Sequence, residues 1–246
     1  LTHSGAVYCW GDNDLNECGT DTPTDRVNTP TPVENPNGVV FTQIAAGKDH
    51  TCALDDAGHG YCWGNPDYGC IGNDYTEQSG HPVEVTMPSG TLFASISAGQ
   101  YHTCAVDTTG MAWCWGYNSN GQLGDNNTAN QQIPVAVMHS TPVFTAISAG
   151  GTHTCALDTN GDAWCWGQGG YGALGDGTQN DSHYPVAVTM PSGVSFVSIH
   201  TGQDLTCALD TDGLVWCWGQ NGSGQCGTGS FATGLVFVPT RIVDPE

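Results

Sequence analysis

Cysteine is the residue type with the clearest chemistry in this sequence, because eight of its twelve cysteines recur as four pairs at one spacing. Two facing thiols can form a disulfide, whereas zinc needs four ligands and no second pair recurs beside each of these. The pairs are Cys52 with Cys62, Cys104 with Cys114, Cys155 with Cys165, and Cys207 with Cys217. The sequence therefore favours four disulfides, which place the protein outside a reducing cytosol.

The residues between the paired cysteines predict how the sulfur atoms meet. Each pair encloses Asp-x-x-Gly, which suits a type I turn whose last residue is left-handed, a three-residue hairpin loop with a G1 bulge. In this register Asp55 faces His59, and counting outward brings Cys52 opposite Cys62. We expect a non-hydrogen-bonded pair, whose Cα atoms approach to about 4.5 Å. Each disulfide should therefore lie within one hairpin.

Four cysteines are left without a partner by this register: Cys9, Cys18, Cys70 and Cys226. The position facing Cys9 would precede Leu1, so we expect more of the fold upstream or a cut there, and Cys9 with Cys18 is the fallback pair. Cys18 and Cys226 replace the leucine of a Gly-Gln-Leu-Gly pattern, and Cys70 lies beside that position. These three could link neighbouring units, but spacing does not fix their connectivity.

Histidine and oxygen ligands offer weaker metal candidates. His50, His102 and His153 share one repeat position, so a ring of imidazoles could hold a metal; the favoured interpretation is a structural histidine that bonds backbone of the adjacent unit. Residues 158–162 resemble the start of a calcium loop but lack its later glycine and bidentate glutamate. The weak calcium candidates are Asp125, Asp176 and Asp181, and no other cofactor is expected.

Three Asn-x-Ser/Thr sequons fall in loops after Cys-Trp-Gly, at Asn126, Asn180 and Asn221. They are candidate glycosylation sites in a host that glycosylates.

The elements that must position these residues repeat along the whole chain. The tripeptide Cys-Trp-Gly recurs about every 52 residues, with tryptophan at Trp10, Trp63, Trp115, Trp166 and Trp218. One unit shows four short strands, at 144–150, 153–158, 162–167 and 184–188, which is typical of a β-propeller blade. We predict an all-β propeller over residues 1–246, a single domain or a segment of one. Its units are roughly 1–38, 39–90, 91–141, 142–193 and 194–246, and the first unit lacks its first two strands.

The paired tryptophans alternate with cysteine on one strand, so both indoles of a pair share a face. We expect most of them to fill the layers between blades; a stacking platform for sugars is the alternative.

The motifs together resemble a known repeat. Ala-Gly-x-x-His-Thr-Cys-Ala-Leu-Asp, followed by Trp-Cys-Trp-Gly, Gly-Gln-Leu-Gly-Asp and Pro-Val-x-Val, is similar to the regulator-of-chromosome-condensation (RCC-type) repeat, most clearly at 98–137 and 149–188. The resemblance spans essentially the entire chain and implies a propeller, typically of seven blades. It also implies functions known in the family: guanine-nucleotide exchange on a small GTPase at chromatin, or inhibition of β-lactamases through the loop face.

Composition excludes several classes of function. The formal net charge of −21, with only three basic residues, repels phosphate backbones, so we expect no nucleic-acid partner. No apolar stretch is long enough to span a membrane, and we see neither an initiator methionine nor a leader peptide. No motif for a nucleophile, phosphate loop or paired carboxylates appears, so we expect no enzyme.

We therefore predict a secreted or surface-attached, non-catalytic propeller that serves as a structural or adhesive part of an assembly or fibre, through contacts with proteins or like subunits. The alternative is a free secreted module that binds a protein, as an inhibitor would, or a glycan. Nucleotide exchange is the least favoured function, because periodic disulfides and the absence of a basic tail disagree with a nuclear role.

Overall fold

The computed structural model describes residues 1–20, 24–35, 38–74, 77–138, 143–229 and 234–243. These residues form one two-stranded and four four-stranded antiparallel sheets, in which strands that follow one another in sequence are neighbours. The first sheet holds β1 (Tyr8–Asp12) and β2 (Arg26–Pro32). The second holds β3 (Phe41–Ala46), β4 (His50–Asp55), β5 (Gly60–Gly64) and β6 (Ser79–Glu84), with the 3-10 helix η1 (Asp67–Gly69) between the last two.

The next three sheets repeat this pattern. The third holds β7 (Phe93–Ala98), β8 (His102–Asp107), β9 (Ala112–Gly116) and β10 (Gln131–Ala136). The fourth holds β11 (Phe144–Ala149), β12 (His153–Asp158), β13 (Ala163–Gly167) and β14 (Ser182–Ala187). The fifth holds β15 (Phe196–Thr201), β16 (Leu205–Asp210), β17 (Val215–Gln220) and β18 (Leu235–Arg241). The predicted four-stranded blades are thereby confirmed.

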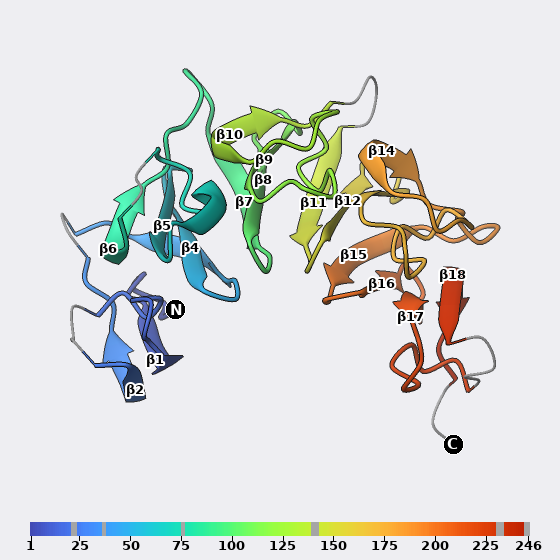
Figure 1. Cartoon of the computed structure of the whole chain (residues 1–246), viewed down its shortest axis with the longest axis horizontal. Helices are drawn as coiled ribbons and strands as arrows, with labels where there is room; N and C mark the ends of the chain where they lie inside the picture. The colour runs from blue at the N-terminus through green and yellow to red at the C-terminus, as the bar shows by residue number, and fades with distance from the viewer. Residues whose placement is uncertain (21–23, 36–37, 75–76, 139–142, 230–233, 244–246) are drawn as a thin grey trace.

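The sheets stand side by side as blades in an open arc, with the first and fifth sheets at its two ends (Figure 1). The first strands of neighbouring blades contact one another, β3 with β7, β7 with β11, and β11 with β15, so they line the inside of the arc. Among the described residues, we find no helix with the length and apolar character that a membrane span requires.

Each predicted hairpin has the expected register. The Asp55 N–H donates to the His59 carbonyl at 3.0 Å, and Gly58 is left-handed with φ of 90°. Cys52 then lies directly opposite Cys62, and their Cα atoms are 4.1 Å apart. The same pairing and separation occur at Cys104–Cys114, Cys155–Cys165 and Cys207–Cys217, so the four predicted disulfides are confirmed.

The turn aspartate has a second role in each hairpin. One Asp107 carboxylate oxygen accepts the backbone N–H groups of Thr109 and Met111, and the other accepts Trp113 Nε1 at 2.9 Å. Trp164 and Trp216 are held in the same way by Asp158 and Asp210. The hairpin turn therefore fixes the first, half-buried tryptophan of each pair.

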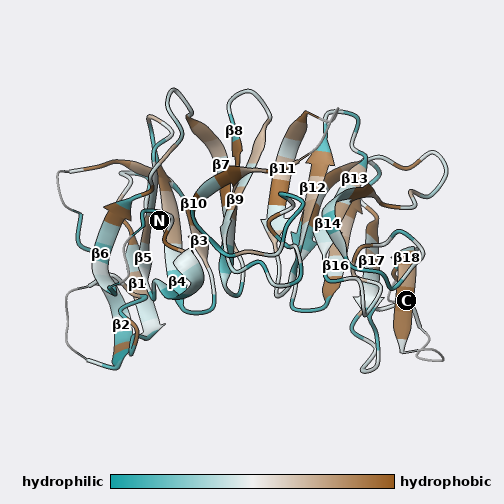
Figure 2. Ribbon diagram, turned by 45° about the horizontal axis from the view of Figure 1, so that its top comes forward, coloured by the Kyte–Doolittle hydropathy of each residue, from teal (hydrophilic) through white to brown (hydrophobic). Residues whose placement is uncertain are grey.

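The tryptophan of the Cys-Trp-Gly motif in each full blade, which is the second of the pair where there are two, lies in the core between two blades. Trp63, Trp115, Trp166 and Trp218 are all 0% exposed. Trp166 of the fourth blade packs in one cluster with Leu123 of the third blade and with Phe144. Figure 2 shows hydrophobic residues along the strands of the middle blades, which agrees with cores that lie between the sheets. The prediction that tryptophans fill these layers is confirmed for the second of each pair.

Candidate functional site

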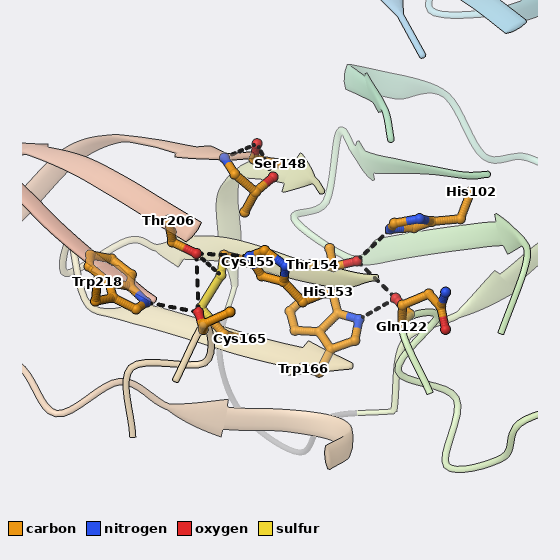
Figure 3. Close-up of a disulfide and its surroundings, with 12 residues drawn as sticks. His102, Gln122, Ser148, His153, Thr154, Cys155, Cys165, Trp166, Thr206 and Trp218 are labelled. Atoms are coloured by element: carbon orange, nitrogen blue, oxygen red, sulfur yellow. Dashed lines mark hydrogen bonds between the residues drawn. A yellow bond between two sulfur atoms is a disulfide. The ribbon is translucent and has the colours of Figure 1, made fainter. Parts of the chain in front are cut away.

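The seams between blades hold the repeating histidines, and their geometry shows what these do. Nε2 of His153 lies 2.9 Å from Oγ1 of Thr206 in the next blade. The Thr206 hydroxyl donates to the Ala173 carbonyl at 3.1 Å, and Trp218 Nε1 donates to the same oxygen at 2.9 Å (Figure 3). Because the threonine proton is used there, His153 must be the donor and is the neutral Nε2–H tautomer.

The two preceding seams have the same arrangement. His50 bonds Thr103, and His102 bonds Thr154, each at 2.9 Å. Burial lowers the pKa of His50 and His153 to about 4 and that of His102 to about 3. These histidines are structural, as the sequence favoured, but the predicted partner was wrong, because a threonine hydroxyl stands between the imidazole and the carbonyl.

The weak calcium candidates lie in loops and accept hydrogen bonds from neighbours in the same loop. Asp125 accepts amide hydrogens from Asn118 and Asn127, and Asp176 accepts the backbone and hydroxyl of Thr178. Asp181 accepts the Gly169 N–H at 2.8 Å. In the described part of the chain, the one group of three carboxylates with oxygen atoms within 4.8 Å of one another is Asp12, Asp14 and Glu17. Calcium binding at the three predicted carboxylates stays a prediction.

The sequons differ in access. Asn126 and Asn180 are exposed in their loops, so both stay predictions. Asn221 is only 2% exposed, and its side-chain oxygen accepts the Cys226 N–H at 3.0 Å. A glycan on this buried amide has no room in the folded blade, so the structure argues against that site.

The four cysteines without a hairpin partner are free thiols. Cys18, Cys70 and Cys226 are buried and donate to backbone carbonyls of their own units, and none of the three forms a link between units. Burial is the main cause that raises the pKa of Cys18 and Cys70 to about 12 and that of Cys226 to about 11. Cys9 lies in hydrogen-bond contact with Cys18. High pKa values make such thiols unreactive.

The two faces of the arc differ in their segments. Because successive strands run in opposite directions, one face carries the turn after each first strand and the long loop after each third strand. We call this side the loop face; its described segments in the four full blades are 47–49, 99–101, 150–152, 202–204, 65–74, 77–78, 117–130, 168–181, 221–229 and 234. The opposite side, with the disulfide hairpins and the connections between blades, is the hairpin face.

A backbone hydrogen bond joins the two kinds of segment on the loop face of every full blade. The Tyr117 N–H donates to the Tyr101 carbonyl at 2.9 Å. The equivalent bonds join Asn65 to Asp49, Gln168 to Thr152, and Gln220 to Asp204. The fold thus places two side chains next to each other at the same point of each blade, and only in the third blade are both tyrosines.

A third tyrosine reaches this point from the neighbouring blade. The Tyr68 ring, in the loop of the second blade, lies 4.8 Å from the Tyr117 ring and 5.5 Å from the Tyr101 ring, between centroids. The Lys48 ammonium donates to the Tyr101 hydroxyl and lies 4.6 Å from the centre of its ring. We call Tyr68, Tyr101, Tyr117 and Lys48 the tyrosine patch.

Two features make the patch a candidate binding surface. Tyr68 is 45% exposed and has left-handed backbone angles (φ 63°), which an aromatic residue rarely adopts. Lys48 and Gln100 also line an open depression of about 450 Å³ on the inside of the arc. An exposed tyrosine that packs on two half-buried ones next to a concave surface is typical of protein interfaces.

Sequence reasoning missed this patch because it considered the positions at which the same residue recurs from unit to unit. The residues equivalent to Tyr101 are Asp49, Thr152 and Asp204, and those equivalent to Tyr117 are Asn65, Gln168 and Gln220. Tyr68 corresponds to Leu15, Asn120, Tyr171 and Ser223. Substitutions of polar residues by aromatic ones at loop positions were the available signal.

Radially arranged, four-stranded antiparallel sheets with cores between them define the β-propeller class. The profile of the RCC1-like domain family matches residues 1–245, and the chain belongs to this family. It is 31% identical to the ultraviolet-B receptor UVR8 of Arabidopsis thaliana over 231 residues, which is 93% of this chain and 52% of the receptor. The chain thus spans about half the length of that relative.

Solved structures agree on the fold. Human WBSCR16 matches all of this chain with a TM-score of 0.88 at 22% identity, over 64% of its own chain. Prp20p of Saccharomyces cerevisiae, whose binding properties to Gsp1p and histones were studied, matches all of this chain with a TM-score of 0.82 at 25% identity, over 61% of its own chain.

Proposed function

We propose that this chain is a non-catalytic, protein-binding propeller of an oxidising, extracellular compartment, and that the tyrosine patch is its main contact site. The observation that carries the proposal is the patch itself, in which three tyrosines from two blades meet once in a chain that otherwise repeats. Aromatic residues with few rotamers are the commonest anchors of protein interfaces. Protein binding also agrees with the studied binding of Prp20p to Gsp1p and histones.

The disulfides support the proposal of an oxidising, extracellular compartment. Each of the four full blades has one, and seven of the eight sulfur-bearing residues are at most 4% exposed. A cytosolic protein would be kept reduced, and these blades would lose the cross-link that each hairpin carries. When the chain is denatured without reduction and then alkylated, mass spectrometry should find only Cys9, Cys18, Cys70 and Cys226 alkylated.

The contact site can be tested with residues that the repeat itself provides. Tyr68→Ser with Tyr117→Gln introduces the residues found at these positions in the fifth blade, so the variant should fold. Tyr171→Ser is the matched control, because Tyr171 occupies the position of Tyr68 in the fourth blade and is 40% exposed. Wild type and variants would be cross-linked to extracellular proteins of the source organism and then compared by quantitative mass spectrometry.

We expect the double variant to recover at least about tenfold less of its specific partner than the wild type does. The Tyr171→Ser control should recover as much as the wild type. Equal recovery with all three chains would contradict the patch as the contact site.

The other predicted role, as a structural or adhesive part of an assembly of like subunits, stays a prediction. Light scattering tests it, because a chain that is monomeric at all concentrations would contradict assembly. Glycan binding and nucleotide exchange, the other predicted functions, have no further support in the geometry of the loop face.

A further inference from the structure

We propose that the loop face binds a cationic segment of its protein partner, and that an arginine side chain of that segment stacks on the tyrosine patch. This inference rests on the proposed function and names the chemistry of the partner. It is argued from the distribution of charge over the two faces and from the contacts of Lys48.

Carboxylates are concentrated on the loop face. The described acidic residues that are not buried on this side, including those of the first sheet, are Asp12, Asp14, Glu17, Asp25, Asp49, Asp67, Asp74, Glu77, Asp125, Asp176, Asp181 and Asp204. On the hairpin face they are Glu34, Asp56, Glu84, Asp162 and Asp212. The turn aspartates of the disulfide hairpins are buried and bond their own turns. The strongly negative net charge is therefore directed mainly to one side.

Cations on the loop face do not offset this charge. In the described residues of this side they are Lys48 and Arg26, and Arg26 stands opposite Asp12 in the register of the first sheet. The Lys48 ammonium lies 3.6 Å from a carboxylate oxygen of Asp49. The face therefore attracts cationic partners over a distance of roughly the Debye length and repels acidic ones.

The contact between Lys48 and Tyr101 shows how a cation is received at the patch. The ammonium lies over one tyrosine ring, while the rings of Tyr68 and Tyr117 have no cation of their own among the described residues. Tyr68 is the most exposed of the three and follows Asp67 directly in the chain. A planar guanidinium stacks on such rings and reaches neighbouring carboxylates with several donors, whereas an ammonium acts as a point charge.

The test uses three synthetic peptides that differ only in one residue type, alternating Gly with Arg, Lys or Glu. Fluorescence anisotropy would measure their binding to the full chain at physiological ionic strength. Asp49→Asn with Asp67→Asn removes two charges beside the patch, and Asp56→Asn with Asp212→Asn removes two charges from the hairpin face as the matched control. Tyr68→Ser tests stacking, with Tyr171→Ser as its control.

We expect the arginine peptide to bind most tightly and the glutamate peptide not to bind. The loop-face charge variant should weaken arginine binding by about tenfold, and the hairpin-face variant by less than about twofold. Tyr68→Ser should weaken binding of the arginine peptide by about threefold or more and reduce the preference for arginine over lysine. Tyr171→Ser should leave both unchanged.

Equal losses in the two charge variants would show general attraction by net charge only and would overturn the proposal, as would absence of binding by the arginine peptide. Neither result affects the outcome of the cross-linking experiment with the Tyr68→Ser, Tyr117→Gln variant, which tests the proposed function. If the captured partner depends on the patch but has no cationic segment, the proposed function is supported and this inference is refuted.

Discussion

The seams between blades and the tyrosine patch occupy neighbouring parts of the molecule but are built on opposite principles. A seam uses residues that recur in several blades, such as His102, Thr154 and Trp166, and the side-chain hydrogen bonds of these three residues join two neighbouring blades. The patch uses two positions that the fold also pairs in each blade, but it fills them with tyrosine only once. Repetition marks the groups that hold the arc together, and departure from it marks the surface that we propose for binding.

Glycine shows how strictly the seams are built. A Cβ atom on Gly99 would lie 2.5 Å from the Gly150 carbonyl oxygen of the next blade, and one on Gly150 would lie 2.7 Å from that of Gly202. These oxygens accept the N–H groups of Gln100 and Gly151, so the first strands can meet at the axis only when no side chain separates them. The patch has no such constraint, because its side chains extend toward solvent.

The largest expected effect comes from removal of a seam tryptophan. Trp166→Ala should destabilise the protein by about 4 kcal/mol, because it removes a completely buried indole and its bond to the Gln122 carbonyl. Urea unfolding followed by circular dichroism would measure the loss. Tyr117→Gln, an exchange within the patch, is the control and should change stability by less than about 0.5 kcal/mol. Equal losses of unfolding free energy in the two variants would show that the patch stabilises the fold as much as the seam does.

The next effect is the pH dependence of the seams. His50, His102 and His153 are neutral in the fold with pKa values of about 4, 3 and 4, while their unfolded value is near 6.5. Below pH 6.5 the unfolded state therefore binds more protons, so the stability present above that pH is lost as the pH falls toward 4. Each histidine with a pKa of about 4 can contribute up to about 3 kcal/mol to this loss.

The contribution of one histidine can be isolated with His153→Leu, since Leu205 occupies the equivalent position in the fifth blade. Unfolding free energies between pH 7.5 and 4.5 should fall less steeply for this variant than for the wild type. An unchanged slope would show that His153 is protonated or exposed in the folded protein. Partner binding at the patch should not show this dependence on pH as long as the blades remain folded.

The sequence was sufficient for the parts of the fold that local geometry decides. The Asp-x-x-Gly turn fixes a hairpin register, and a strand has a side-chain period of two, so Cys104 could meet only Cys114. The partner of His153 could not be obtained in this way, because Thr206 reaches it from another sheet and the relative placement of blades depends on packing. The same holds for Tyr68 and Tyr117, whose rings meet across a seam.

The smallest expected effect concerns the stability of the patch itself. Tyr68 is held in a left-handed conformation that disfavours aromatic residues, whereas asparagine adopts it more readily. Tyr68→Asn loses ring contacts with Tyr101 and Tyr117 but releases this strain, so we expect the unfolding free energy to stay within about 0.5 kcal/mol of the wild type while partner binding falls. Urea unfolding and the cross-linking assay on the same preparation measure both quantities. A loss of several kcal/mol would instead place Tyr68 among the residues that hold the blades together, because a side chain retained for binding contributes little to the fold that positions it.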